Sequence, residues 1–337
     1  MSKNYSVYLI SSAKRNYQES VEHVKNSANY LKGIGYCDLY DYDFKRNIAM
    51  PRKVAKNTLK EQLNIIHTGL GNPFACMTGI ANYYVAQSSL NLLLNSDINS
   101  FKYNAYIASK LYILGSEEYN AWIWGYNTSC FFTPIMSDSP ELLTYLKKCK
   151  DSYRADILYE KKDTDTYSFF LRNTLLALAG DWELLKERAL LFLNDPKKQK
   201  ADEKRIPDHE FYVGLCNQSI DEMRTALNKL LEPKLARRAV YDNNVWFDFY
   251  LQMQVVMYAK IAAIHGFDLG IDSPIAPKEL IEYKPLDKYE DPYDFMKEYD
   301  FSRPHQEWID MWHERMRIAK EQEEKTKKKG FFSWFKR

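Results

Sequence analysis

The chain has 337 residues, and 45% of them are hydrophobic, so it is long and apolar enough to bury a sizeable core. Its formal net charge is only +2, which does not favour nucleic acid as a partner, and its 12 glycines and 12 prolines are few for an all-β protein built on tight turns. We therefore expect an all-α fold, a multi-helix bundle. No apolar run reaches the length of a transmembrane helix, the start does not resemble a secretory signal, and the five cysteines show no CxxC or zinc-ligand spacing. These features predict a cytoplasmic protein with no bound metal and no cofactor.

The first 160 residues are expected to form an N-terminal helical region, with helices over residues 17–31, 54–66, 74–94 and 103–114. Tyr36–Asp43 interrupts this pattern, because tyrosines alternate there with acidic residues. The segment could be a short strand or an extended loop, and we favour a loop.

Residues 161–300 are expected to form a helical-hairpin region. One hairpin spans residues 167–193 and turns at Gly180–Asp181, and a second spans residues 208–231 and turns at residues 217–219. The two turns lie roughly 37 to 39 residues apart, which is a spacing typical of stacked helix-pair repeats. We therefore expect stacked hairpins that are solenoid-like in part.

Residues 242–266 hold the longest helical pattern in the chain. Apolar residues recur there at three- and four-residue spacing on one face and also cover most of the opposite face. A helix that is apolar nearly all round is normally buried on several sides, so we expect a central buried helix against which the hairpins pack. Gly266 is expected to end it, and Pro274 and Pro277 prevent its continuation.

The last part of the chain is expected to form a C-terminal helix over residues 301–326, followed by a basic and aromatic tail, residues 327–337. Residues 320–337 contain seven basic and three acidic residues, a net charge of +4, so the remaining residues carry about −2. Basic residues attract anionic lipid and aromatic residues favour the membrane interface, so weak membrane association of the tail is conceivable. We favour a disordered terminus instead.

No recognisable catalytic motif is present in the sequence. Gly69–Gly71 lacks the third glycine and the preceding strand of a dinucleotide-binding loop, and His313–Glu314 lacks the second histidine of a zinc-protease helix. Asp208–Glu210 groups three polar ionisable residues, but acids at the start of a helix complement its dipole, so we favour capping over a metal or acid–base site. Cys76 and Cys130 have no partnered base and are expected to be core thiols. We therefore expect no catalytic residue and no enzyme activity.

Two segments rich in tyrosine and aspartate, residues 36–43 and residues 283–295, form the candidate binding surface. Tyrosine supplies a large contact area at low entropic cost, and acids steer a protein toward a basic partner. Prolines at positions 285 and 292 limit the freedom of the second segment. The competing interpretation is that the second segment packs back on the central helix and only stabilises the fold. The predicted partner-binding residues are Tyr40, Asp41, Asp287, Tyr289, Glu290, Asp291, Tyr293 and Asp294.

Four stretches carry a resemblance to a known family. They are ALAGDWELL at residues 177–185, FYVGLCNQSIDEMRTALNKLLEPKLARR at 211–238, YAKIAAIHGFDLGIDSPIAPKEL at 258–280 and YKPLDKYEDPYDFM at 283–296. This part of the chain, roughly residues 167–296, resembles the Immunity 49 family of bacterial polymorphic-toxin immunity proteins. The resemblance rests on patterns of helix packing. It implies an all-helical immunity protein that binds a cognate toxin domain and blocks it.

Two other functions stay open at this point. A helical-repeat scaffold or regulator with an unrelated protein partner should show a continuous groove along its stacked hairpins. A helical enzyme with an unfamiliar site should show an enclosed pocket with converging ionisable groups. An immunity protein should instead inhibit its toxin at one equivalent, without turnover. If the immunity protein is cytoplasmic, its toxin is expected to have a cytosolic target.

Overall fold

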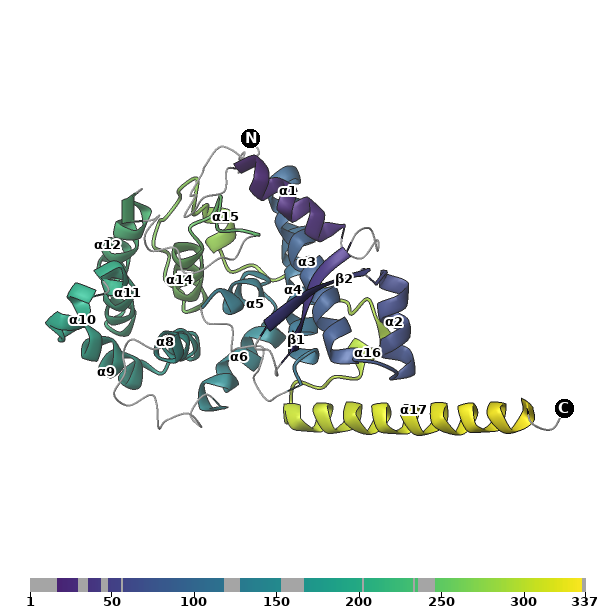
Figure 1. Cartoon of the computed structure of the whole chain (residues 1–337). Helices are drawn as coiled ribbons and strands as arrows, with labels where there is room; N and C mark the ends of the chain where they lie inside the picture. Colours follow the sequence, from purple (N-terminus) through teal and green to yellow (C-terminus); the bar gives the residue numbers. More distant parts are fainter. Residues whose placement is uncertain are drawn as a thin grey trace.

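The computed structural model describes residues 17–29, 36–43, 48–55, 57–117, 128–152, 167–201, 203–232, 234–235 and 246–334. They form an all-α multi-helix bundle (Figure 1) with one hydrophobic core that includes buried side chains from Val24 to Trp312. The predicted fold class is therefore confirmed. One two-stranded antiparallel hairpin accompanies the helices in the described part of the chain.

The first group of helices is α1 (Tyr17–Ala28), α2 (Leu59–Thr68), α3 (Pro73–Asn95) and α4 (Ile98–Leu114). Helices α3 and α4 pack along each other, and both α1 and α2 contact α3. Helix α2 begins later than predicted, because Thr58 and Glu61 close a capping box at its start. Helix α4 begins earlier than predicted, because the Asp97 side chain accepts a hydrogen bond from the Ser100 amide and caps the helix there.

The segment Tyr36–Asp43 is strand β1, so the prediction of a loop is wrong. It pairs with β2 (Ile48–Ala55) in a register that runs from Tyr36 opposite Ala55 to Asp43 opposite Ile48. Alternation of side-chain type with a period of two is itself a strand pattern, and β2 supplies the pairing partner that a strand needs. Pro51 is compatible with β2, because each strand of a two-stranded sheet is an edge.

A middle segment joins this first group to the hairpins. It contains the 3-10 helix η4 (Thr128–Phe131), α5 (Phe132–Met136) and α6 (Pro140–Ser152). Helix α5 contacts α4, and α6 contacts both α5 and the first helix of the hairpin region. The predicted boundary between the N-terminal region and the hairpin region, at residues 160 and 161, lies outside the described residues.

Both predicted helical hairpins are confirmed. The first is α8 (Tyr167–Ala179) with α9 (Trp182–Leu193), the second is α11 (Ile206–Cys216) with α12 (Ile220–Leu231), and α10 (Pro196–Ala201) and the 3-10 helix η6 (Glu203–Arg205) connect them. Helix α9 contacts both α8 and α11, so the pairs stack, and we call α8, α9, α11 and α12 the array. Gly214 allows α11 and α12 to approach closely, because a Cβ at this position would lie 2.8 Å from the backbone nitrogen of Met223. No third pair follows α12 among the described residues, and the solenoid prediction is not confirmed.

Helix α14 (Met253–Ile264) is the predicted central helix. Residues 253–262 are all buried, and α14 contacts α5, α8 and α12. It ends where predicted, since Gly266 has a φ of +89°, in the left-handed region that favours glycine.

The start of the central helix differs from the prediction. Residues 246–252 are turns and irregular backbone, and residues 242–245 lie outside the described residues. The Gln252 amide donates to the carbonyl of Ile275 at 2.7 Å, and its side-chain amide donates to the carbonyl of Leu230 at 3.1 Å. These hydrogen bonds satisfy the polar groups of Gln252 without a helix. This explains why the helix begins later than the apolar spacing predicts.

The last elements are α15 (Lys278–Ile281), α16 (Asp294–Lys297) and α17 (His305–Trp334). Trp308, Ile309 and Trp312 bury the first half of α17 against the body. The helix then continues through the segment predicted as a separate tail, and its end projects past α2 (Figure 1). Gly69 ends α2 with a φ of +70°, in the left-handed region that favours glycine, and it lies against the backbone of Arg315 on α17.

Candidate partner-binding surface

Residues 282–294, which we call the strap, link α15 to the start of α16 and lie across α4. The Tyr103 hydroxyl donates to the carbonyl of Glu290 at 3.2 Å. The Tyr106 hydroxyl and the Lys110 ammonium both donate to the carboxylate of Asp291, at 3.0 and 2.8 Å. Because these three donors project from α4 at three- and four-residue spacing, they hold the strap along one face of that helix.

A cluster of buried charges lies beneath the beginning of the strap. The carboxylate of Asp138 binds the ammonium groups of Lys102 at 2.6 Å and Lys260 at 2.5 Å, and all three side chains are at most 4% exposed. The three residues come from α4, the turn between α5 and α6, and α14. Burial disfavours the charged ammonium and lowers the pKa of Lys260 to about 8, although Asp138 opposes this shift.

The charge cluster is tied to the main chain of the strap. The ammonium of Lys102 donates to the carbonyl of Lys284 at 2.8 Å, and that of Lys260 donates to the carbonyl of Glu282 at 2.6 Å. In return, the Lys284 amide donates to the Asp138 carboxylate at 3.1 Å. Two ammonium groups share one carboxylate, so the strap carbonyls supply acceptors that a buried charge needs.

The inner side chains of the strap are aromatic and bind the body. The Tyr289 hydroxyl donates to the carbonyl of Ser137 at 2.8 Å and accepts from the Leu286 amide at 3.0 Å. Burial raises the pKa of Tyr289 to about 12, so this hydroxyl stays protonated and can keep donating. The Tyr293 and Tyr84 hydroxyls lie 3.0 Å apart, which joins the end of the strap to α3.

The outer side chains of the strap are acidic and exposed. Asp287 and Glu290 lie in the solvent-facing part, and the Asp294 side chain is 97% exposed. Lys288 pairs with Glu290 and holds the pKa of that carboxyl below its usual value, and Lys297 does the same for Asp294. Surface ion pairs of this kind are weak, so these acids remain available to a partner.

The structure brings the six predicted strap residues into one segment but divides them by role. Tyr289, Asp291 and Tyr293 contact the body, as the competing structural interpretation expects for them, whereas Asp287, Glu290 and Asp294 face solvent. Tyr40 and Asp41 lie in β1, but their side chains lie outside what the structure describes. A role of these residues in binding stays a prediction.

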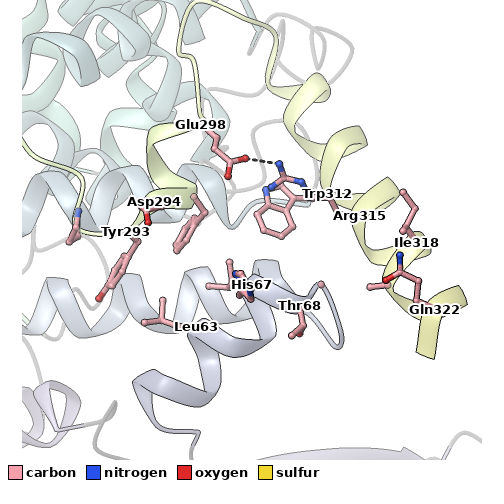
Figure 2. Close-up of a pocket in the computed structure, with 15 residues that line it drawn as sticks. Leu63, His67, Thr68, Tyr293, Asp294, Glu298, Trp312, Arg315, Ile318 and Gln322 are labelled. Carbon is pink, nitrogen blue, oxygen red and sulfur yellow. Dashed lines mark hydrogen bonds and ion pairs between the residues drawn. The ribbon is translucent and has the colours of Figure 1, made fainter. Parts of the chain in front are cut away.

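A groove of about 600 Å³ adjoins the C-terminal end of the strap (Figure 2). Its walls are the end of α2, the start of α16 and the middle of α17. Ile66 and Trp312 are buried in its walls, Ile318 is 41% exposed, and an ion pair between Glu298 and Arg315 at 2.6 Å spans its upper end in Figure 2. The other residues that line it are Leu63, His67, Thr68, Gly69, Pro292, Tyr293, Asp294, Phe295, Ala319 and Gln322.

Sequence reasoning missed both the charge cluster and the groove. Lys260 stood within the apolar periodicity of the central helix, and a lysine in an apolar stripe is a signal of a buried charge that requires a partner. Its partners Lys102 and Asp138 lie far away in the sequence and carry no such signal. The groove combines residues from α2 and α17, and no local pattern connects these two helices.

The ionisable residues at the start of α11 do not converge on a site. Asp208 pairs with Arg205 at 3.3 Å, and Glu210 pairs with Lys229 on α12. His209 is buried and stacks on Phe192 with ring centroids 4.2 Å apart. Burial, with the positive charges of Arg205 and Arg188, lowers the pKa of His209 to about 3, so the ring is neutral at ordinary pH.

The structure describes both cysteines that were predicted to be core thiols, Cys76 and Cys130. Cys76 is buried and Cys130 is partly exposed, and burial raises the pKa of both thiols, which disfavours the reactive thiolate. In the described ranges, no three His, Cys, Asp or Glu side chains gather where they could hold a metal ion. No helix in the same ranges is both long enough and apolar enough to cross a bilayer.

Comparison with known proteins gives a match to a protein family. The model of a family described as Immunity protein 49 matches residues 85–280, which is more than half of the chain. The matched part runs from within α3 to α15, so it contains the charge cluster and the array but ends before the strap. No curated protein and no solved structure matches the chain. The chain therefore belongs to the Immunity protein 49 family.

Proposed function

We propose that this immunity protein neutralises a cognate toxin by binding it stoichiometrically, with the outer edge of the strap and the adjoining groove as the contact surface. Membership of the family supports an immunity-type function against a toxin. The observation that carries the proposed surface is the division of the strap into a fixed inner side and an exposed acidic outer side. A segment that is ordered before binding loses less conformational entropy when a partner binds.

The charge of the strap defines the kind of toxin surface that fits. Three exposed acids, Asp287, Glu290 and Asp294, follow one another along the outer edge and lead to the groove. They complement a basic surface, such as the cleft of a toxin domain that acts on an anionic substrate in the cytosol. The apolar wall of the groove would then bury a side chain of the toxin, which is the kind of contact that contributes most to affinity.

The test uses the toxin domain encoded beside this protein, with growth rescue and co-purification as the first readouts. Titration of toxin activity should reach a sharp end point near one equivalent. Full protection far below one equivalent would show turnover and would contradict the proposal.

The surface itself is tested by a triple charge reversal, Asp287→Lys with Glu290→Lys and Asp294→Lys. We expect slower association with the toxin, most of all at low salt, because the screening length is longer there. The matched control reverses three exposed acids elsewhere, Glu22, Glu187 and Glu232, and should leave association almost unchanged. Equal effects of the two variants would show that only the net charge matters.

One observation favours the alternative of a helical-repeat scaffold. A second groove, of about 410 Å³, follows α11 between α9 and α12, and it is lined by Leu193, Val213 and Ala226 among others. Substitution by tryptophan of Thr225, an exposed residue that also lines this groove, would fill it. If that variant, rather than the strap variant, abolished binding of the toxin, the array would be the interaction surface.

A further inference from the structure

Helix α17 has two parts with different surroundings. Met316 is the last residue of α17 that packs against the hydrophobic core, and Glu321, Gln322 and residues 324–328 are all exposed. The helix nevertheless continues to Trp334. With a rise of 1.5 Å per residue, its end stands roughly 27 Å beyond the last core contact. Figure 1 shows this end extending away from the body.

The projecting end is strongly basic. Residues 325–337 contain six basic residues and no acidic one, so this segment carries +6 while the whole chain carries only +2. The basic residues begin with Lys325 and include the run Lys327–Lys329. The charge of the chain is therefore divided, with a net-acidic body and a cationic helix end.

Large aromatic residues follow the basic run directly. Phe331, Phe332 and Trp334 lie in the last turns of α17, and Phe335 follows it. Positions 327, 331 and 334 recur at four- and three-residue spacing and so share one face of the helix. At about 100° per residue, this face lies roughly 120° around the helix from positions 315, 319 and 322, which line the groove, and in line with Ile309 and Met316, which pack against the body. The basic and aromatic positions thus continue the body-facing side of α17 beyond Met316, the last residue of the helix that packs against the core.

We propose that the end of α17 docks this protein on the surface of an anionic lipid bilayer. Lysines close to such a surface are attracted by its negative potential, and aromatic rings are most stable at the boundary between headgroups and acyl chains. Association at the surface also agrees with the absence, within the described residues, of a helix that could cross a bilayer. The proposal does not depend on toxin binding, because no residue of α17 after Gln322 lines the groove and none belongs to the strap.

The experiment uses the full-length protein and sedimentation with two kinds of vesicle, phosphatidylcholine alone and phosphatidylcholine mixed with phosphatidylglycerol. We expect binding to the anionic vesicles only, and weaker binding as salt is raised. The variant Lys327→Glu with Lys328→Glu and Lys329→Glu should bind on the order of a hundredfold more weakly, since each lysine near the surface contributes about fivefold. Phe331→Ser with Trp334→Ser should lose at least about tenfold.

The matched control is Lys60→Glu with Lys197→Glu and Lys200→Glu, which makes the same change of net charge at exposed lysines of α2 and α10. It should bind the anionic vesicles nearly as well as the wild-type protein. The proposal is overturned if the wild-type protein does not prefer anionic vesicles, or if the control loses as much affinity as the tail variant. It is also overturned if duplex DNA displaces the protein from vesicles while the aromatic substitutions change nothing, because the basic run would then recognise any polyanion.

Discussion

In the array, apolar side chains such as Leu185, Phe211 and Leu227 fill the space between helices that follow one another in the sequence. The strap has almost no helix or strand of its own, and it is fixed by hydrogen bonds to a buried charge cluster and to tyrosines of α4. The array is thus stabilised mainly by burial of apolar surface, which tolerates modest changes of shape. The strap depends on a few polar contacts, and each of them has a large individual effect.

This difference indicates that the array and the strap have separate roles in the molecule. A surface that must recognise one partner benefits from an irregular segment that is held rigidly, because its side chains can be placed without the constraint of a helical period. Helices α8 and α12 of the array enclose the central helix together with α5 and α15. Four measurements test whether the strap and the array differ in this way.

The largest effect is expected from Asp138→Asn, which removes the single carboxylate of the charge cluster. The amide still fits the left-handed backbone of this residue, where φ is +56°, so the variant isolates the loss of charge. Two buried ammonium groups would then lack a counter-charge, and the free energy of unfolding should fall by roughly 3–5 kcal/mol. Urea denaturation measures this. The control Asp181→Asn removes the half-exposed pair with Lys150 and should cost far less. A small effect of Asp138→Asn would show that the cluster does not hold the fold.

The second effect concerns the array and depends on pH. The folded state keeps His209 neutral down to a pKa of about 3, whereas the unfolded chain binds a proton near 6.5. The unfolded state therefore binds more protons in this window, and stability falls as the pH falls, by about 2 kcal/mol between pH 7 and pH 5. His209→Phe should flatten this dependence. Parallel pH profiles of the wild-type protein and His209→Phe would contradict the interpretation.

A third, smaller effect is expected in the strap from Tyr289→Phe. The variant keeps the ring against Tyr106 but loses the hydrogen bonds to Ser137 and Leu286, which should cost about 1 kcal/mol. Amide hydrogen exchange at Leu286 should become faster. Tyr283→Phe, at a tyrosine of the same strap that is 37% exposed, is the control. Unchanged exchange at Leu286 would mean that other contacts suffice to fix the strap.

The smallest effect on stability is expected from the triple reversal of Asp287, Glu290 and Asp294. These side chains face solvent and form only weak surface pairs, so the melting temperature should not change measurably. The same variant should slow association with the toxin. A marked loss of stability, with affinity intact in the folded fraction, would assign these acids to the fold rather than to binding.

The sequence predicted the array well, because each of its helices carries its own apolar periodicity and its turns contain Gly180 or the capping residue Ser219. It also identified the strap as a candidate surface from composition alone. It could not divide the strap into inner and outer side chains, since Asp291 and Asp287 look alike until Lys110 is placed beside one of them. The strand at Tyr36–Asp43 was missed because its partner had to be recognised first.

The charge cluster has a further consequence for how this molecule can change. It binds the strap through the main-chain carbonyls of Glu282 and Lys284 and the main-chain amide of Lys284. Every amino acid except proline provides both of these groups. The outward-facing residues of the strap can therefore be substituted without loss of these main-chain hydrogen bonds. A lineage under pressure from new toxins, or a designer grafting recognition loops, could vary Asp287, Glu290 and Asp294 while the same two lysines and one aspartate keep the segment in place.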